Sequence, residues 1–214
     1  MSKWLGNEIP KLSVIWEGSV AIRKTLLTIA KHRLALARAG RKLGVPWIRI
    51  FKHDNSKFHP IEFMQYVRKF ELGVDEPEKW AKAWKHHWQH NDHHIEYWED
   101  KALTFTPSPN TADGDLMNEG GIGGGTHAGR DGPIWMPNNA VREMIADWIA
   151  GSLAYSGQYP KAGQWKWGSQ NLVDRLLKLE TQQQSKHCTR SFAVSLLVKN
   201  KMITDEQIKA AWRK

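Results

Sequence analysis

Residues 17–42 read EGSVAIRKTLLTIAKHRLALARAGRK, and apolar side chains recur along them at helical spacing. The apolar positions that follow this spacing are Val20, Leu27, Ala30, Leu34 and Ala37. Gly40 and Gly44 follow, and glycine is common where a helix ends. The stretch therefore predicts one long helix with His32 near its middle.

The segment from Pro77 to Lys101 predicts a second long helix. It reads PEKWAKAWKHHWQHNDHHIEYWEDK. Proline is favoured in the first turn of a helix, and neither glycine nor a further proline interrupts the segment. We expect one uninterrupted helix here.

Shorter helices are predicted in the rest of the chain. They fall at residues 45–52, 61–72 and 139–155, with two or three more between Gln170 and Trp212. Asn138 or Asn139 is expected to cap the helix at 139–155. The pattern never alternates for long enough to require a strand, so the predicted fold class is all-α.

Residues 104–137 interrupt this helical pattern with several prolines and the run GGIGGG. Such a composition predicts a long surface insertion, either a lid or a disordered loop. The glycines do not form a phosphate-binding loop, because no Lys-Ser or Lys-Thr pair follows them. We expect a metal-binding helical domain over residues 1–160 and a C-terminal helical extension over 161–214, packed on the same domain.

The composition predicts a soluble protein of the reducing cytoplasm. The 214 residues contain no apolar run of membrane-spanning length, no secretory signal and a single cysteine, Cys188. Lysine and arginine outnumber aspartate and glutamate by 31 to 22, which gives a net charge of +9. This excess favours a phosphate-bearing partner, although a solvated basic surface explains it equally well.

The pair His53-Asp54 is the centre of the predicted functional site. His32 precedes it by twenty-one residues, and Asp147 lies far downstream among apolar residues, where a carboxylate needs a partner. One divalent ion bound by all four side chains would satisfy them together. Mixed nitrogen and oxygen ligands suit Zn, Mn, Fe or Ni better than Mg. The alternative is that Asp147 pairs with an arginine or caps a backbone group.

Lys57 follows Asp54 by three residues and is a candidate contact for a substrate phosphate. Arg49 and Lys52 are further cations close by in the sequence. Together with the metal ligands they predict a site for a phosphorylated small molecule.

Histidines are concentrated between His86 and His94. On a continuous helix His87, Asn91 and His94 share one face, which we expect to line the same cavity as the His53-Asp54 pair. They would bind a second ion or act as catalytic groups beside the substrate. The adjacent face, which is expected to point away, carries His86, His90 and His93.

The alternative for this segment is a solvated histidine face on an ordinary surface helix. The other flank of that helix carries aromatic side chains that are expected to pack in the core. They are Trp80, Trp84, Trp88, Tyr97 and Trp98.

The ordered set of His32, His53-Asp54, Lys57 and Asp147 resembles the signature of the HD-domain superfamily of metal-dependent phosphohydrolases. More closely, HDNSKF, HNDHHIEYW and MIADW resemble a small family of bacterial and phage proteins that shares HD-x-SKF, N-x-HH-x-EYW and a late DW. The resemblance covers about residues 30–155. It implies an HD-domain-like helical bundle in the cytoplasm of a bacterial cell or a phage-infected host.

The resemblance also implies a role for each matching residue. His32, His53, Asp54 and Asp147 match the metal ligands, and Lys57 matches the lysine that faces the phosphate. His87 and His94 occupy the region in which binuclear members place two further histidines. The implied cofactor is one or two divalent ions, with Mn, Zn, Ni, Fe and Mg as the candidates.

Three functions follow from these predictions. The first is metal-dependent hydrolysis of a nucleotide or another small phosphate ester. The second is an oxygenase with two iron ions, because some binuclear HD-domain proteins use the same ligand set for oxygen activation. The third is a non-catalytic protein that binds nucleic acid through its tryptophans and holds a structural metal.

Overall fold

The computed structural model describes residues 12–104, 134–179 and 189–212. Within them, the predicted all-α class is confirmed, and the only extended pairing is one parallel bridge between Ile134 and Leu179. No helix in these ranges is long and apolar enough to cross a membrane. The elements are α1 (Leu12–Leu43), α2 (Trp47–Lys52), the 3-10 turn η1 (Asn55–Phe58), α3 (Pro60–Tyr66), the π-helical turn η2 (Val67–Glu71), α4 (Pro77–Gln89), α5 (Ile95–Thr104), α6 (Asn138–Ser156), α7 (Lys166–Leu177), α8 (Thr189–Lys199) and α9 (Asp205–Ala211).

Helix α1 buries one stripe of side chains that recurs every three or four residues. The stripe consists of Ala21, Thr25, Ile29, His32, Leu36, Ala39 and Leu43. The predicted helix is confirmed, but all five apolar positions that predicted it lie outside this stripe; Leu27 and Leu34 are 51% and 53% exposed. His32 points into the molecule because it belongs to the buried stripe.

Helix α1 ends at Gly44, whose φ of 75° is readily adopted by glycine. The amide of Val45 donates to the carbonyl of Gly40 at 2.8 Å, which closes the last turn. The chain then turns directly into α2, so the His53-Asp54 pair at the end of α2 lies beside α1.

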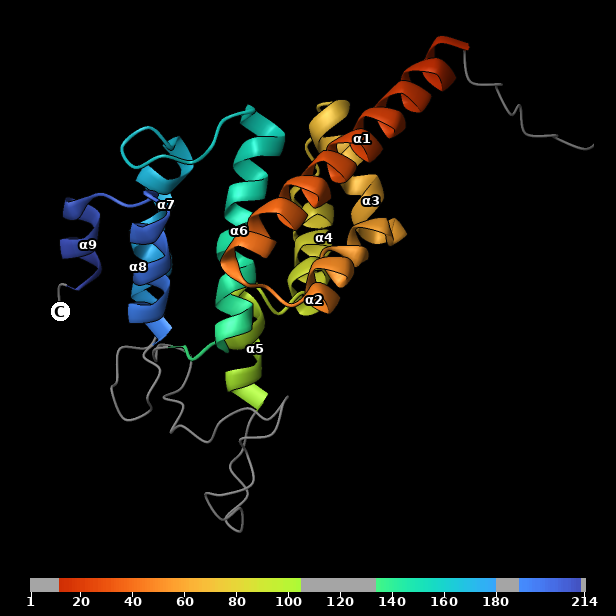
Figure 1. Ribbon diagram of the computed structural model, residues 1–214. Helices are drawn as coiled ribbons and strands as arrows, with labels where there is room; N and C mark the ends of the chain where they lie inside the picture. The colour runs from red at the N-terminus through yellow and green to blue at the C-terminus, as the bar shows by residue number, and fades with distance from the viewer. Residues whose placement is uncertain (1–11, 105–133, 180–188, 213–214) are drawn as a thin grey trace, which may run out of the picture.

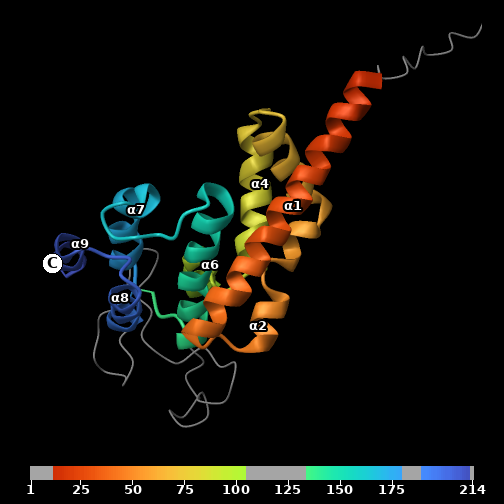
Figure 2. The ribbon, with the colours of Figure 1, turned by 45° about the horizontal axis from the view of Figure 1, so that its top comes forward.

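Helix α6 runs through the middle of the molecule, with α1 across one side and α8 packed against the other (Figure 1, Figure 2). Its small residues Ala140, Ala146 and Ala150 are fully buried, so neighbouring helices can approach closely. The helix predicted at 139–155 is confirmed. The predicted cap is wrong, because the N-cap position is Pro137, which makes no side-chain hydrogen bond.

The long helix predicted over residues 77–101 is two helices. Helix α4 ends at Gln89 and α5 begins at Ile95, with an irregular turn between them. The Asn91 amide group donates to the carbonyl of His87 at 2.7 Å and so satisfies a backbone acceptor at the end of α4. Asparagine and aspartate compete for backbone hydrogen bonds and favour turns, so Asn91-Asp92 ends the helix without glycine or proline.

The C-terminal helices α7, α8 and α9 confirm the prediction of two or three short helices before Trp212. They belong to one continuous hydrophobic core that extends from α1 to α9. The buried Arg190 side chain donates to the carbonyl oxygens of Leu177, Leu179 and Ala211 and so joins α7 to the end of α9.

Most of the predicted insertion, residues 105–133, lies outside the described residues. Its last part is described and differs from the expected surface loop. Ile134 and Met136 are 8% and 1% exposed and belong to the core. The chain therefore rejoins the core at Ile134, although the next helix begins only at Asn138.

Candidate metal centre

The chain turns sharply at the His53-Asp54 pair. Asp54 has the left-handed conformation, with φ of 54° and ψ of 24°. Few residues other than glycine adopt it, and aspartate does so more readily than most. Consecutive side chains in a continued helix would point about 100° apart, whereas this turn lets His53 and Asp54 face one interior point.

Arg33 holds this turn from α1. Its guanidinium donates to the carbonyl oxygens of Phe51 at 2.7 Å and His53 at 2.5 Å, and to Asn55 Oδ1 at 2.7 Å. The two carbonyls lie at the C-terminal end of α2, where a helix leaves acceptors without internal partners. Because Arg33 follows His32 directly, one turn of α1 supplies both a candidate ligand and the side chain that fixes two others. Sequence reasoning did not select Arg33.

Four of the predicted ligands converge on one point. His32 Nε2 lies 3.2 Å from His53 Nε2 and 3.0 Å from Asp147 Oδ1. Asp54 Oδ2 lies 3.3 Å from His32 Nε2 and 3.1 Å from His53 Nε2. Atoms 3.0–3.3 Å apart can each lie about 2 Å from a common point, which matches the bond lengths of Zn²⁺ to nitrogen and oxygen ligands. This first group can hold a metal ion.

A second group shares Asp54 with the first. Asp54 Oδ1 lies 3.6 Å from His87 Nε2 and 3.7 Å from His93 Nε2. His94 completes the group, with its Nε2 atom 3.0 Å from His87 Nε2. These four residues can also hold a metal ion. Asp54 thus turns one carboxylate oxygen toward each group.

The turn between α4 and α5 changes the predicted facing of the histidines. His93 was expected to point away, but it is 2% exposed and belongs to the second group. The reason is that residues 90–94 leave the helix, so helical spacing no longer decides where their side chains point. His86 lies outside both groups, as predicted, with its Nδ1 atom 2.6 Å from Glu62 Oε1.

Asn91 differs from its predicted catalytic role. Its side chain is buried and donates to the carbonyl of His87 and, at 2.7 Å, to the hydroxyl of Ser56. A cavity lies beside the two groups, and Asn91 is not among the residues that line it. It holds the turn in place and connects it to η1.

Two buried glutamates orient the histidines from behind. Glu143 Oε1 lies 2.9 Å from His53 Nδ1 and 3.4 Å from His93 Nδ1. Glu62 Oε2 lies 2.9 Å from His87 Nδ1. A carboxylate that accepts from Nδ1 leaves Nε2 free of its proton, which is the arrangement that supports metal binding.

Sequence reasoning missed both glutamates, although one signal was available. Glu143 precedes Asp147 by four residues on a helix, so the two carboxylates share a face. Glu62 belongs to the HPIEF stretch after the His53-Asp54 pair, and nothing in its spacing identified it.

Arg49 was predicted to lie near a substrate phosphate, but its guanidinium is paired with two carboxylates of the protein. Its Nε atom donates to Glu143 Oε2 at 2.6 Å, and its guanidinium forms a bidentate ion pair with Asp92. Arg49 therefore supports the glutamate behind the ligands and joins it to the turn after α4. Lys52 is exposed and does not line the cavity.

Asp54 is ionised in this setting. Burial would raise the pKa of its carboxyl, but the charges of His53 and Lys57 outweigh burial and hold that pKa well below its ordinary value. Lys57 is 6% exposed, and its Nζ atom lies 2.5 Å from Asp54 Oδ2 and over the ring of Tyr66. Burial would lower the pKa of Lys57, yet the charge of Asp54 raises it well above normal.

Two histidines of the second group have lowered pKa values, so they favour the uncharged form. Burial lowers the pKa of His87, and burial, with the imidazoles of His93 and His87 close by, lowers the pKa of His94 well below its usual value. Both imidazoles are therefore neutral at pH 7, which is the form that binds a metal.

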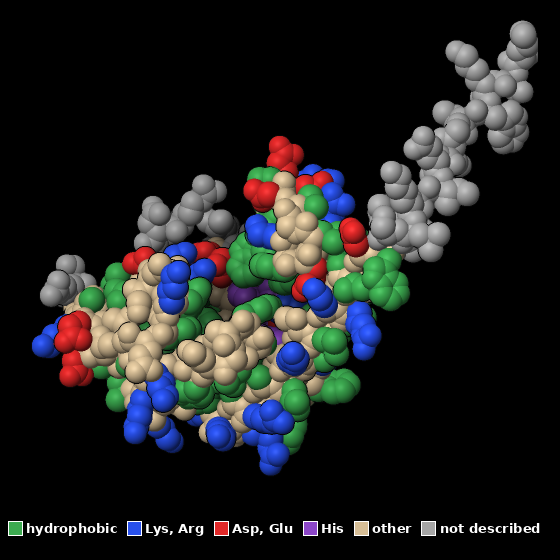
Figure 3. Space-filling model, turned by 90° about the horizontal axis from the view of Figure 1, so that it is seen from above, with side chains coloured by type: hydrophobic (Ala, Val, Ile, Leu, Met, Phe, Trp, Pro, Cys, Tyr) green, Lys and Arg blue, Asp and Glu red, His purple; other side chains and the backbone are tan. Residues whose placement is uncertain are grey.

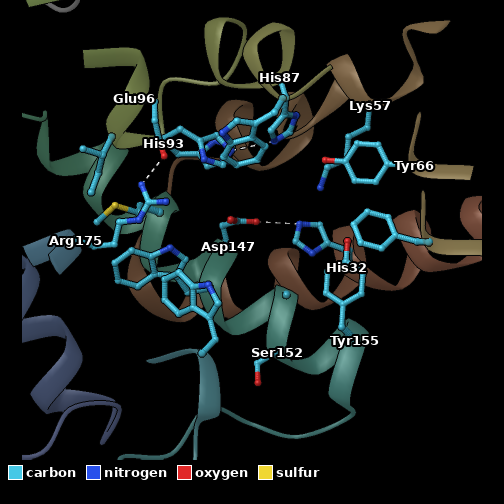
Figure 4. A pocket seen from close by; sticks show the side chains of 18 of the residues that line it. His32, Lys57, Tyr66, His87, His93, Glu96, Asp147, Ser152, Tyr155 and Arg175 are labelled. Atoms are coloured by element: carbon cyan, nitrogen blue, oxygen red, sulfur yellow. Dashed lines mark hydrogen bonds and ion pairs between the residues drawn. The ribbon is translucent and has the colours of Figure 1, made fainter. Parts of the chain in front are cut away.

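A cavity of about 580 Å³ lies beside the two groups. Histidine side chains are visible at the bottom of a hollow in the surface (Figure 3). His32, Lys57, His87, His93 and Asp147 line the cavity, and Figure 4 shows them around it. One face of α6 forms much of a wall, with Met144, Asp147, Trp148, Gly151, Ser152 and Tyr155 at helical spacing.

Aromatic rings make up most of the remaining walls. Trp80 and Trp84 were expected in the core, but both are half-buried and line this cavity. Trp98 packs against the core, as expected. Trp80 and Trp84 share a face of α4 with His87. Because His87 belongs to the second group, this face points toward the candidate metal centre and not into the core.

Comparison with known proteins gives a family. A family of unknown function, DUF5662, has a model that matches residues 21–191. The matched segment includes every member of both groups and both supporting glutamates. No curated protein and no solved structure matches the chain. Since the match covers well over half of the 214 residues, the chain belongs to the DUF5662 family.

Proposed function

We propose that the protein is a metal-dependent phosphohydrolase that acts on a nucleotide or another small phosphate ester. The observation that carries this proposal is the first group, in which two imidazoles and two carboxylates meet beside a cavity and each imidazole nitrogen lies 3.0–3.3 Å from the other imidazole nitrogen and from both carboxylates. The resemblance of His32, His53-Asp54, Lys57 and Asp147 to the HD-domain signature supports the same reading.

The donor set fits a divalent ion such as Zn, Mn, Ni or Fe. Mixed imidazole and carboxylate ligands at these separations suit such ions better than Mg. A bound ion of this kind supplies Lewis acidity, which polarises a phosphoryl oxygen and makes water a better nucleophile at neutral pH.

Side chains of the protein supply the rest of the chemistry. Lys57 lines the cavity beside Asp54, so a phosphate that reaches the ligand atoms also meets the ammonium group. His94 lines the same cavity and is neutral. A neutral imidazole can accept a proton from water as the phosphate is attacked.

An oxygenase with two iron ions is the second candidate. It is favoured by one feature, the orientation of Asp54, which turns an oxygen toward each of two adjacent groups. The two candidates differ in metal content, because the oxygenase needs two redox-active irons and hydrolysis does not.

The test is metal analysis combined with phosphate release. Protein purified without chelator is expected to hold one or two divalent ions per chain and to release phosphate from esters in a metal-dependent way. Asp54→Ala should lose both properties and keep its helical circular dichroism, while Asp174→Ala, an exposed control on α7, should keep all three. Retention of stoichiometric metal by Asp54→Ala contradicts the site. Two irons with oxygen consumption and no hydrolysis would replace the proposal with the oxygenase.

A further inference from the structure

The cavity beside the metal centre contains a cluster of three tryptophans. Trp148 directly follows the candidate ligand Asp147 on α6, and its ring centroid lies 5.4 Å from that of Trp167 and 6.3 Å from that of Trp165. The rings of Trp165 and Trp167 are 5.0 Å apart and only 35° from parallel. All three line the cavity.

One glycine allows Trp165 to lie in this cluster. A Cβ atom at Gly168, in the first turns of α7, would stand 2.1 Å from Trp165 Cε3. Glycine within a helix is less favourable than alanine, and here its absent side chain makes room for the ring. Trp165 is 9% exposed, so its position is fixed by packing. Trp167 is 37% exposed and is the member of the cluster that a ligand can still cover.

The charged groups that line the cavity limit how many phosphates it can accept. Among the described lining residues, Lys57 and Arg175 are the only lysine or arginine. Lys57 is paired with Asp54, and Arg175 Nη1 lies 2.5 Å from Glu96 Oε1. Apart from a bound metal ion, the described lining therefore has no unpaired lysine or arginine to offset the roughly four negative charges of a triphosphate, and buried charge without partners is strongly unfavourable.

The two ends of the cavity therefore differ. Figure 4 shows Arg175 and Glu96 on the opposite side of Asp147 from Lys57 and His32. The end with Lys57 and the ligand atoms suits a single phosphate group. The end with the Glu96–Arg175 pair offers hydrogen-bond donors and an acceptor in the same cavity that the tryptophans line, which suits the polar edge of a flat ring.

We propose that the substrate is a phosphate monoester whose alcohol carries a flat aromatic ring system, such as a nucleoside monophosphate, and that the tryptophan cluster of Trp148, Trp165 and Trp167 binds that ring. This inference rests on the proposed function for the phosphate end alone. Stacking on indole rings accepts any base because every base has a flat face. A volume of about 580 Å³ is within the range for small-molecule sites.

The test separates ring binding from hydrolysis. Adenosine has no phosphate to hydrolyse, so its binding to the chelator-treated protein is measured by calorimetry. The wild type and the control Trp47→Leu, an exposed tryptophan on α2, are expected to bind it, and Trp167→Leu about tenfold more weakly. Trp167→Phe, which keeps a stacking ring, should restore most of the affinity.

The same variants are then compared on esters with the metal-loaded protein. The ratio kcat/KM for adenosine monophosphate should exceed that for ribose 5-phosphate by about tenfold or more and should also exceed that for adenosine triphosphate. Absence of adenosine binding with equal turnover of ribose 5-phosphate overturns this inference and leaves the proposed function intact. Turnover of the triphosphate above the monophosphate overturns the single-phosphate assignment. Adenosine binding that depends on Trp167, without hydrolysis of any ester, supports the ring site and refutes only the hydrolase.

Discussion

Glu143→Gln tests the support of the candidate metal centre most directly. Glu143 is 3% exposed and accepts from His53, a member of the first group, and from His93, a member of the second. Its other oxygen accepts from Arg49 at 2.6 Å. The glutamine variant keeps the shape of the side chain but removes the charge and one acceptor oxygen.

The size of the effect follows from the pKa of Glu143. Burial would raise this pKa, but hydrogen bonds from His53 and His93 lower it from 4.5 to about 2. Each pKa unit corresponds to about 1.4 kcal/mol, so the ionised carboxylate stabilises the folded state by about 3 kcal/mol at pH 7. Because the folded-state pKa is depressed, this contribution is complete above pH 4.5 and is lost as the pH falls toward 2. At pH 3 about half of it should remain.

The assay is urea unfolding of metal-free protein at both pH values. Glu143→Gln should lower the free energy of unfolding by about 3 kcal/mol at pH 7, and the difference from wild type should shrink by about half at pH 3. Its metal affinity should fall by about 10- to 100-fold. The control Glu99→Gln, whose carboxylate pairs with Lys178 near the surface, should change either quantity little. Equal stability and equal metal affinity of Glu143→Gln and wild type at pH 7 would refute the supporting role.

Three further predictions concern other side chains of the site. Lys57→Ala should raise KM for a phosphate ester by about tenfold or more with metal content unchanged, and unchanged kinetics would show that Lys57 does not contact the phosphate. His93→Ala should lower the metal content or the turnover, whereas His86→Ala should change neither; both variants are scored by metal analysis and by turnover of a nucleotide panel. If His86→Ala had the larger effect, His86 and not His93 would belong to the second group. Arg33→Ala should destabilise the protein by about 1–2 kcal/mol, because it removes the donor from one part-buried and one exposed carbonyl oxygen at the end of α2, and a thermal melt with no shift would contradict this.

The first group could be predicted from the sequence because its members are distinctive. Asp147 stands among apolar residues, where a carboxylate needs a partner, and the ordered set of His32, His53-Asp54 and Asp147 resembles the HD-domain signature. The glutamates behind them are not distinctive by type, since most glutamates are exposed. Glu143 could have been found only by asking which residue shares a helix face with Asp147.

The facing of α1 shows where periodicity alone is insufficient. Two apolar stripes run along this helix, and the one through Leu27 and Leu34 is largely exposed. The buried stripe passes through His32. The position of the candidate ligand could have indicated the buried face, because a helix that supplies a metal ligand buries the side that carries it.

The facing of His93 was predicted wrongly because the turn between α4 and α5 was not predicted. Helical spacing placed His93 away from the site, but the Asn91-Asp92 pair ends α4 and brings His93 and His94 back toward His87. Whether a backbone leaves the helix at one residue depends on tertiary partners, here the Ser56 hydroxyl and the Arg49 guanidinium. Those partners are more than thirty residues away and cannot be found by reading the local pattern.

The charges around the candidate centre explain why a cation belongs there. Four carboxylates surround it, and within the part of the chain that the structure describes the permanent cations paired with them are Lys57 and Arg49. The carboxylates are Asp54, Glu62, Glu143 and Asp147. Without a metal the deficit must be met by protons on the imidazoles, and burial opposes this, although the facing carboxylates raise the pKa of His53 well above its ordinary value. Two protonated nitrogens cannot share the 3.2 Å between His32 Nε2 and His53 Nε2 without facing their hydrogens toward each other. A divalent ion relieves both problems, so its binding should release protons and be stronger at higher pH.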